Sequence, residues 1–525
     1  MTDVTRDDGA GGGGSRNDAV IIDGSPLRRD DVVAVAHRGA RAELAADIDE
    51  RMAPARRVVD EVVAGDQTVY GITTGFGALA STRIDVTEAE ELQLSLVRSH
   101  NAGVGPPLPK PLVRAMMLLR ARTLSQGHSG IRSLVVARIL RLLELDVLPV
   151  VPSQGSVGAS GDLAPFAHLA LPLVGEGLVW EGDRQVPAAE ALARHGLEPL
   201  RLQSKEGLSL LNGTEGMLAM GVLGLDRAER LAAVADAACA LSVEALLGSI
   251  RPFDPRVHAL RPHPGQIRSA ELIRRLVVDS EINSSHADDF DHAVQDAYSL
   301  RCAPQVHGAV RDVLANAAAV FERELGAVVD NPIVFPEDGA VISGGNFHGQ
   351  PLAFALDFMA IGVAELASIS ERRTDRILDP DRSSGLPPFL AAKPGLSSGY
   401  MITQYTAAAL VAENRVLAHP ASVDSVPTSG LQEDHVSMGW GAGRKLGDVL
   451  ANATRVLAIE VMCAAEGVER RGPLRPGPGV AAIVEAVRQV VAPLGEDRPV
   501  GGDIEALAVA LEAGLLDQVL DPYQP

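Results

Sequence analysis

Apolar residues return at every third or fourth position over long stretches in the second half of the chain. These stretches predict helices over 215–251, 304–329, 351–377, 402–417, 435–467, 480–491 and 504–515. Several of them exceed the mean helix length of about 11 to 12 residues in globular proteins. Helices of such length are typical of a bundle, in which they pack side by side.

The first part of the chain has a mixed pattern. Helical spacing predicts helices over 41–65, 88–99, 111–125, 131–145 and 163–175. The short apolar segments VIIDG and VVAVA, within 20–36, predict strands, and 179–207 predicts a hairpin followed by a surface helix. Two stretches here, YGITTGFG and GSVGASGDLAP, are rich in glycine and lack periodicity, which predicts loops.

These patterns predict a mainly α-helical protein with three parts. Residues 1–18 are polar and Gly-rich and are expected to be a disordered tail. Residues 19–214 form a smaller, mixed N-terminal part, and residues 215–525 form a long central helical bundle with C-terminal helices. A composition of 46% hydrophobic but only 3% aromatic residues favours helix-on-helix packing.

The charge of the chain excludes some classes of partner. Its formal net charge is −21, so we expect neither nucleic acid nor an anionic membrane surface as a general partner. The chain has four lysines, Lys110, Lys205, Lys393 and Lys445, which disfavours a pyridoxal enzyme that works through a lysine Schiff base.

The cysteines and the N-terminus bear on the compartment. Cys239, Cys302 and Cys463 are odd in number and far apart, which suits a reduced compartment better than a disulfide framework. The N-terminal tail lacks the apolar region of a signal peptide. No run of about 18 apolar residues is free of charges and helix breakers, so we expect no membrane span. The sequence therefore predicts a cytoplasmic protein.

The loop GSVGASGDLAP, at 155–165, could carry unusual backbone chemistry. Gly161 has no Cβ, so its amide nitrogen could fold back onto the Ala159 carbonyl carbon and close a five-membered ring with loss of water. Loss of the Ser160 hydroxyl as a second water would leave an exocyclic methylene, which is an electrophile. Taken alone, however, the tripeptide is more typical of a flexible loop before a helix.

Other irregular junctions before helices hold the unusual polar and aromatic residues of the chain. Each one alone is compatible with a cap, a structural ion pair or a packing residue. Loops are nevertheless where functional groups concentrate. The candidates are Tyr70, Ser99-His100, Asn212, Gln295, Tyr298, Arg301, Asn331, Phe347 and Gln432-Glu433.

Metal and phosphate sites are weakly indicated. The segment HADDFDH, at 286–292, combines carboxylates and histidines, but the chain has neither HExxH nor paired CxxC motifs. A solvated acidic face is therefore the preferred interpretation, and we expect no metal. The glycines of GWGAGRK lack the spacing of a phosphate-binding loop.

Together, the motifs identify a family. YGITTGFG, GSVGASGDLAP, KEGLSLLNGT, QDAYSLRCAPQVHG, DNPIVF, SGGNFHG and QEDHVSMG follow one another in the order found in lyases and aminomutases that use a methylidene-imidazolone group, and the resemblance covers nearly all of the chain after the tail. It implies a fold of the fumarase/ammonia-lyase type. It also implies that Ala159-Ser160-Gly161 cyclises autocatalytically to 4-methylidene-imidazol-5-one, with no exogenous cofactor, and that four subunits share their active sites.

The resemblance also implies roles for the candidate residues. Tyr70 is the expected base for the β-proton, and Tyr298 and Glu433 are the other expected catalytic residues. Arg301 would hold the carboxylate of an amino-acid substrate in a bidentate grip. The remaining substrate-binding residues are expected to be His100, Asn212, Gln295, Asn331, Phe347 and Gln432.

Two residues suggest which substrate is used. A carboxylate such as Glu433 can hold an imidazole, and relatives that deaminate phenylalanine or tyrosine differ at Ser99-His100 and at the carboxylate of QED. The expected reaction is thus the non-oxidative deamination of L-histidine to urocanate and ammonia. Thr73, Leu431 and His307 depart from the familiar pattern and leave room for a retuned pocket.

Three alternatives remain at this point. The first is an ammonia-lyase or 2,3-aminomutase acting on tyrosine, phenylalanine or a related amino acid. The second is a helical assembly protein in which Ala159-Ser160-Gly161 never cyclises. The third, a fumarase-like helical lyase, predicts a GSSxMPxK signature, which this chain lacks.

Overall fold

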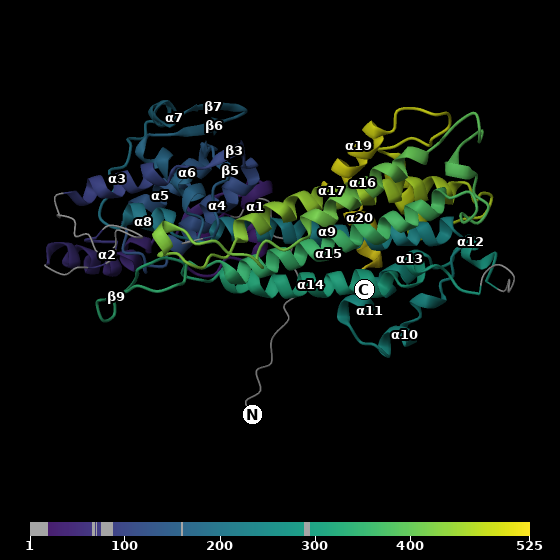
Figure 1. Ribbon diagram of the computed structural model, residues 1–525, viewed down its shortest axis with the longest axis horizontal. Coiled ribbons are helices and arrows are strands. Elements are labelled where there is room, and N and C mark those ends of the chain that lie inside the picture. The colour runs from purple at the N-terminus through teal and green to yellow at the C-terminus, as the bar shows by residue number, and fades with distance from the viewer. Residues whose placement is uncertain (1–18, 66–68, 70, 75–87, 159–160, 288–293) are drawn as a thin grey trace.

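The computed structural model describes residues 19–65, 69, 71–74, 88–158, 161–287 and 294–525. Tyr70, Ala159, Ser160 and the predicted tail lie outside the described residues. The molecule is elongated, with a mixed part at one end and long helices running toward the other (Figure 1). This arrangement confirms the mainly helical fold with a long bundle.

Four long helices form the centre of the bundle. They pack against one another along their lengths, and their contacting faces are lined by Ala, Leu, Val and Gly. Small residues permit close approach: a Cβ added to Gly308 would lie 2.3 Å from the Cα of Gln266 on a neighbouring helix. The central helices are α9 (Glu215–Ala245), α14 (Ala303–Glu324), α15 (Gln350–Leu378) and α17 (Gly439–Glu469).

Shorter helices surround this centre. They include the predicted helices near 402–417, 480–491 and 504–515, which the structure places within three residues of the expected bounds. The helices are α10 (Pro255–Ala259), α11 (Pro264–Leu276), α12 (Glu281–Ser284), α13 (Tyr298–Arg301), α16 (Met401–Leu417), α18 (Pro478–Arg488), α19 (Gly501–Glu512) and α20 (Asp517–Leu520). Short 3₁₀ turns lie at Leu171–Val174, Arg251–Phe253, Pro388–Leu390, Ser429–Leu431 and Asp521–Tyr523.

The N-terminal part combines helices with small sheets. Its helices are α1 (Arg29–His37), α2 (Ile48–Ala64), α3 (Ala89–His100), α4 (Lys110–Leu124), α5 (Ser133–Glu144), α6 (Leu163–Ala170), α7 (Ala188–Arg194) and α8 (Glu206–Leu211). In the sheets, β1 (Val20–Ile22) pairs in parallel with β2 (Ala42–Leu44), while the other pairs are antiparallel. The remaining strands of this part are β3 (Val104–Pro107), β4 (Leu148–Pro149), β5 (Pro152–Gln154), β6 (Leu178–Glu181) and β7 (Arg184–Pro187). A later segment adds β8 (Ile333–Phe335), which packs against α2, and β9 (Ala340–Ile342).

The strand predicted for VVAVA is wrong, because these residues belong to helix α1. The Asp31 carboxylate accepts the backbone N–H of Arg28 at 2.9 Å and caps the helix start. Val32, Val35 and Ala36 then fall on one buried face. The helix predicted over 41–65 is also too long, since Ala42–Leu44 pairs with β1 and the helix starts at Ile48.

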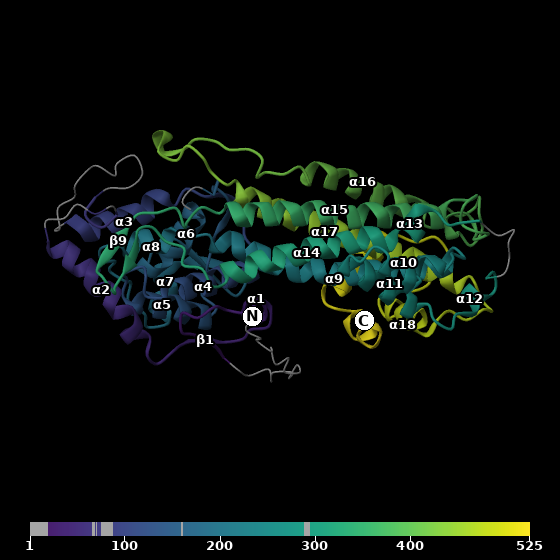
Figure 2. The same cartoon turned by 90° about the horizontal axis from the view of Figure 1, so that it is seen from below.

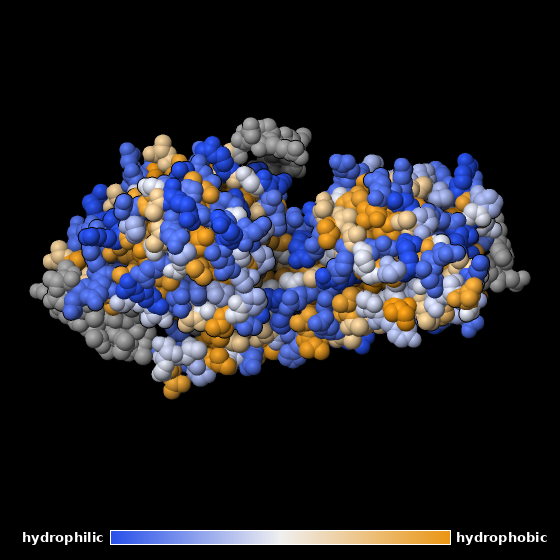
Figure 3. Space-filling view, turned by 90° about the horizontal axis from the view of Figure 1, so that it is seen from above, coloured by the Kyte–Doolittle hydropathy of each residue, from blue (hydrophilic) through white to orange (hydrophobic). Residues whose placement is uncertain are grey.

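Helix α15 is long and apolar enough to cross a membrane by length and composition, and it is the one such helix among the described residues. Within the structure, 67% of its most apolar window is buried. It packs against α9, α14, α16 and α17, as Figure 2 shows from below, and so has the position of a core helix. From above, the surface is mostly hydrophilic with separate apolar patches (Figure 3).

Candidate active site

The loop at 155–165 is anchored beside the N-terminus of α9. Gly161 has φ +76°, and a Cβ added to it would lie 2.0 Å from the carbonyl oxygen of Gly213. The next amide, Asp162 N–H, donates to that same oxygen at 2.6 Å. Only glycine therefore fits at Gly161 in this conformation.

The residues just before position 159 are held as closely as Gly161. Gly158 has φ +75°, and a Cβ there would lie 2.1 Å from the Ser437 hydroxyl oxygen. The Val157 carbonyl accepts the N–H of Met438 at 2.9 Å. Described residues thus fix the chain on both sides of positions 159 and 160.

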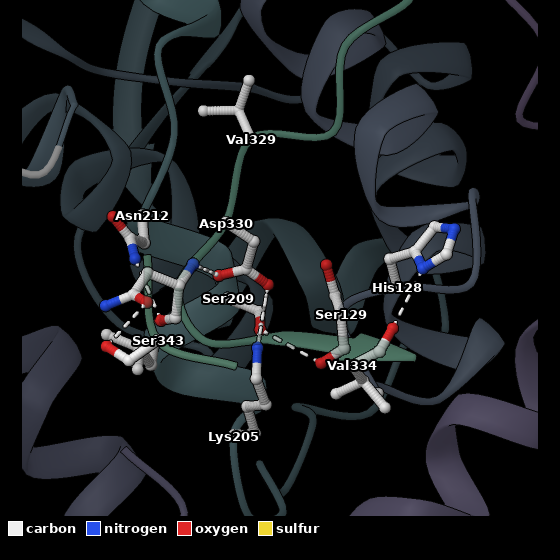
Figure 4. A network of polar contacts seen from close by, with 12 residues as sticks. His128, Ser129, Lys205, Ser209, Asn212, Val329, Asp330, Val334 and Ser343 are labelled. Carbon is white, nitrogen blue, oxygen red and sulfur yellow. Dashed lines mark hydrogen bonds and ion pairs between the residues drawn. The ribbon is translucent and has the colours of Figure 1, made fainter. Parts of the chain in front are cut away.

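Asn212 and Asn331 form one hydrogen-bonded unit, and Asn212 directly precedes Gly213, which pairs with Gly161. Figure 4 labels Asn212 and Ser343 of this unit. Asn212 Nδ2 donates to the Asn331 carbonyl at 3.1 Å, and Asn331 Oδ1 accepts from Ser343 Oγ at 3.1 Å and from Gly344 N at 2.9 Å. Both asparagines are buried. Two of the predicted site residues are therefore in direct contact.

Buried charges support the same region. Arg120 is fully buried and donates to Glu215 Oε1 at 2.6 Å and to the Asn212 carbonyl at 3.1 Å. Asp162 Oδ2 accepts the N–H of Met217 at 2.9 Å. Complete burial raises the pKa of Asp162 well above its usual value, which the Met217 hydrogen bond opposes.

Three buried oxygen atoms in this region have no hydrogen-bond partner among the described residues. They are Asp162 Oδ1, Asn212 Oδ1 and Glu215 Oε2. Unpaired buried oxygens are costly and mark places where a polar group can bind. The glycine-only position at Gly161 is the feature that fits ring closure over residues 159–161, whereas the unpaired oxygens are acceptors suited to a donor such as an ammonium or imidazole N–H.

His100 and Glu433 lie within electrostatic reach of each other. His100 ends α3, where its Nδ1 lies 2.9 Å from the Leu96 carbonyl oxygen, and Glu433 Oε2 accepts the Thr428 hydroxyl at 2.7 Å. Burial lowers the pKa of His100, while the Leu96 carbonyl and the charge of Glu433 oppose that shift. Residues more than 300 positions apart in the sequence thus influence each other electrostatically here.

The loops that carry Phe347 and Gln432 are joined through two histidines. The rings of His348 and His435 stack with centroids 5.9 Å apart, and His348 Nε2 lies 3.3 Å from the His435 carbonyl oxygen. Phe347 is half-buried and Gln432 is exposed. Both loops therefore belong to the same end of the molecule as Asn331 and Glu433.

Gln295, Tyr298 and Arg301 are not brought to this region. Tyr298 and Arg301 are the end residues of α13, which lies toward the opposite end of the molecule from α8 in both ribbon views (Figures 1 and 2). Tyr298 is 70% exposed, and the Arg301 guanidinium lies 4.5 Å from its ring centre. Gln295 and Arg301 line a cavity of about 1090 Å³ beside Arg274.

A buried charge network connects α13 to the bundle. Arg373 is paired with Glu460 at 2.5 and 2.8 Å, and it also donates to the Ser299 carbonyl of α13 at 3.3 Å. His307 lies in this network, fully buried, with its Nδ1 2.7 Å from Asp236 Oδ1. His307 therefore sits in the bundle core, which explains how an unusual residue is accommodated there.

Comparison with known proteins decides the family. Residues 27–489 match the family described as aromatic amino acid lyase. The chain belongs to the aromatic amino acid lyase family. The match spans most of the N-terminal part and the bundle, and it confirms the family predicted from the ordered motifs.

Individual members of the aromatic amino acid lyase family are similar over nearly the whole chain. The chain is 54% identical over 501 residues to histidine ammonia-lyase of Sorangium cellulosum, covering 94% of this chain and 97% of that relative. It is 52% identical over 504 residues to histidine ammonia-lyase of Gloeobacter violaceus, covering 96% and 98%.

Solved structures of the family have the same fold. Histidine ammonia-lyase from Trypanosoma cruzi has a TM-score of 0.89 at 43% identity, with 97% of this chain and 96% of that chain covered. Tyrosine aminomutase from Streptomyces globisporus has a TM-score of 0.91 at 39% identity, with 96% and 99% covered.

Some residues around the site carried no motif signal of their own. Arg120 and Arg373 lie in ordinary helical sequence and become notable only through burial. Asp330 stands in the DNPIVF motif, where only its neighbour Asn331 was a candidate. Lys205 stands within the KEGLSLLNGT motif and is one of only four lysines, and these two features could have marked it as a candidate. Among the described residues, no group of three or more His, Cys, Asp or Glu is placed to bind a metal; most of HADDFDH lies outside them.

Proposed function

We propose that this lyase converts L-histidine to urocanate and ammonia. The observation that carries the proposal is the similarity, over nearly the whole chain, to histidine ammonia-lyases that are 52% and 54% identical. The charge of Glu433, which opposes the lowering of the His100 pKa, supports it. A carboxylate and a neutral imidazole offer an acceptor and a donor to a second imidazole. The relatives that are about half identical to this chain carry the same activity in their names.

We propose that Ala159-Ser160-Gly161 forms 4-methylidene-imidazol-5-one. The glycine-only position at Gly161 and the Asp162 N–H bonded to the Gly213 carbonyl would hold the group, while the unpaired Asn212 Oδ1 would accept from a donor on the substrate. When formed, the group supplies an electrophile that makes the substrate amine a better leaving group. The N-terminus of α9 adds positive potential beside Gly213 and so favours developing negative charge.

The remaining roles concern the substrate. Arg301 carries a fixed cation suited to a carboxylate, and Tyr298 and Gln295 lie beside it to orient the amino acid. Tyr70 remains the proposed base for the β-proton. A phenol has a pKa of about 10, so such a base needs an environment that favours its anion by about 4 kcal/mol at pH 7. Asn331, Phe347 and Gln432 complete the proposed contacts.

We further propose that several copies of the chain share each site, in a cytoplasmic homotetramer. The proposed substrate groups lie at two ends of one chain, so one copy cannot bring them together. Helices α15 and α16 expose an apolar face that suits burial against another copy. Its residues are Phe354, Phe358, Ile361, Ile402 and Tyr405, each 44% to 63% exposed.

The test is urocanate formation by the purified protein. Urocanate absorbance should grow with time in the presence of L-histidine, and phenylalanine and tyrosine should give no cinnamate or coumarate. The Glu433→Gln variant should lose activity toward histidine because its amide no longer supplies the negative charge beside His100. Inert histidine together with consumption of phenylalanine or tyrosine would contradict the proposal.

A second candidate is a 2,3-aminomutase or an ammonia-lyase for tyrosine. The TM-score of 0.91 to tyrosine aminomutase favours it. Chromatography of the products distinguishes the two functions, since an aminomutase returns a β-amino acid and releases no stoichiometric ammonia.

A further inference from the structure

A buried lysine lies behind Asn212. Lys205 is fully buried, and its Nζ donates to Asp330 Oδ2 and to Ser209 Oγ, each at 2.9 Å. Ser209 Oγ also donates to Asp330 Oδ2 at 2.9 Å (Figure 4). A charge removed from water is costly unless it is paired, so this lysine fixes the Asp330 carboxylate in one orientation.

The second oxygen of Asp330 transmits this orientation. Asp330 Oδ1 accepts the backbone N–H of Asn331 at 2.7 Å, so both carboxylate oxygens are engaged. The carbonyl of Asn331 in turn accepts Asn212 Nδ2 at 3.1 Å. A continuous chain of hydrogen bonds therefore runs from Lys205 through Asp330 and Asn331 to the side chain of Asn212.

This chain determines where the amide oxygen of Asn212 points. A backbone carbonyl accepts but cannot donate, so the atom of Asn212 that faces Asn331 must be nitrogen. The oxygen then faces the other way, buried and without a partner among the described residues. An unpaired buried acceptor held in one direction is prepared for a donor from a bound molecule.

The backbone of this segment is held by a different group. Arg120 donates to the carbonyls of Ser209 and Asn212, independently of Lys205. The loss of the lysine therefore leaves the end of α8 anchored, whereas the Asp330 carboxylate that holds the Asn331 N–H loses its charged partner. The contribution of Lys205 is thus directed to the side chain of Asn212.

We propose that Lys205 is a positioning residue, which acts through Asp330 and Asn331 to set the orientation of the Asn212 amide. This inference rests on the proposed function, in which Asn212 contacts the reacting groups. Misplacement of a contact by about 1 Å can cost about 100-fold in rate.

The first test is Lys205→Met, which keeps the length of the side chain and removes its charge. The kcat for histidine should fall about 10- to 100-fold, while KM changes less than about 3-fold. Intact mass should still lack two waters. Hydrogen exchange of the Asn331 amide should become faster, because Asp330 no longer holds it.

The matched control is Arg132→Met. Arg132 forms an ion pair at 2.7 Å with Glu206, the first residue of α8, but contacts neither Asp330 nor Asn331. This variant should lower the melting temperature while kcat stays within about 2-fold of the parent value and Asn331 exchange is unchanged.

If Lys205→Met fails to fold, Ser209→Ala gives a gentler test. It removes one of the two donors to Asp330 Oδ2 and should lower kcat about 3-fold. When either substitution is added to an Asn212→Ala variant, kcat should fall by less than about a further 2-fold, because the amide that Lys205 positions is already absent.

The outcomes separate the two proposals. Wild-type protein that neither consumes histidine nor binds urocanate in calorimetry would overturn the proposed function, whatever Asn331 exchange shows. If the wild type is active, an unchanged kcat in Lys205→Met, or effects that multiply with Asn212→Ala, would overturn the positioning role.

Discussion

The polar side chains around Asn212 are buried and held from several sides, whereas those around Arg301 stand half-exposed or exposed on a four-residue helix. Asn212 is 3% exposed, and Tyr298 is 70% exposed. The first region has ion pairs behind it, Lys205–Asp330 and Arg120–Glu215, both with nearly complete burial. The second region is joined to the core by the buried Leu300 side chain and by the bond from Arg373 to the Ser299 carbonyl.

This difference suggests separate roles for the two regions under the proposed function. A single chain preorganises the region that carries the proposed electrophile, because its residues are locked by packing before any ligand binds. In the Arg301 region the Tyr298 side chain is exposed, and under the proposed function another copy of the chain completes this half of the site. The predictions below test this division, starting with the largest expected effect.

Ser160→Ala should abolish turnover, with a loss of at least about 1,000-fold, because the exocyclic methylene of the proposed group derives from the serine side chain. Urocanate formation from histidine and the intact mass of the variant would check this. The parent protein should lack two waters relative to its sequence. Full activity in the variant, or an unmodified mass in active parent protein, would refute the electrophile.

Arg301→Leu should raise KM for histidine about 100-fold, since a charge-assisted bidentate contact with the substrate carboxylate is lost. The melting temperature should stay within about 1 °C because Arg301 lacks an ion-pair partner among the described residues and lies partly in solvent. Steady-state kinetics and thermal unfolding measure the two quantities.

Arg301→Lys is the matched control. Its KM should lie between those of the parent and Arg301→Leu, because lysine keeps the positive charge but cannot form the bidentate contact of a guanidinium. A large fall in melting temperature for Arg301→Leu would instead mean that Arg301 is part of the folded framework, as the residues around Asn212 are.

Glu244→Gln should change the pH dependence of stability at the α13 end. Burial raises the pKa of Glu244 to about 7, and its carboxyl group accepts the N–H of Gly477 at 3.0 Å. The unfolded chain loses this proton near pH 4.5, so the folded state binds more protons between about pH 4.5 and 7. The parent protein should thus lose up to about 3 kcal/mol across this window as pH rises.

Denaturant unfolding at pH 5 and pH 7.5 would check the contribution of Glu244. The Gln variant should show a smaller loss of stability than the parent between these values. A parent protein that becomes more stable over this window, with the variant unchanged from it, would contradict the assignment.

The sequence predicted the bundle well because long amphipathic helices contain their own signal. The helix predicted over 402–417 is observed at Met401–Leu417. The helix predicted from 435 begins only at Gly439, because Met438 adopts φ +58° and caps it. The strand prediction for VVAVA was wrong because β-branched residues favour strands, whereas capping by Asp31 and burial of one face favour the helix that is observed.

The site was harder to predict, because its geometry depends on distant contacts. The ordered motifs predicted the family, and the charge of Glu433 acts on His100 as expected from the sequence. No local pattern could tell that Arg301 lies at the other end from Asn212, or that Lys205 reaches Asp330 across 125 positions of sequence. Those facts come from how the helices pack.

The most direct test of the divided site is a mixing experiment with two inactive variants. Ser160→Ala damages only the Asn212 region, and Arg301→Leu damages only the α13 region. The two chains, carrying different tags, would be co-expressed, and oligomers with both tags would be isolated and assayed with histidine. If different copies supply the two regions, about one quarter of the sites in a random mixture contain two intact halves, and urocanate formation should return toward that fraction of wild-type activity. If each chain builds its own site, no site is intact, and activity no greater than that of the separate variants would contradict the account.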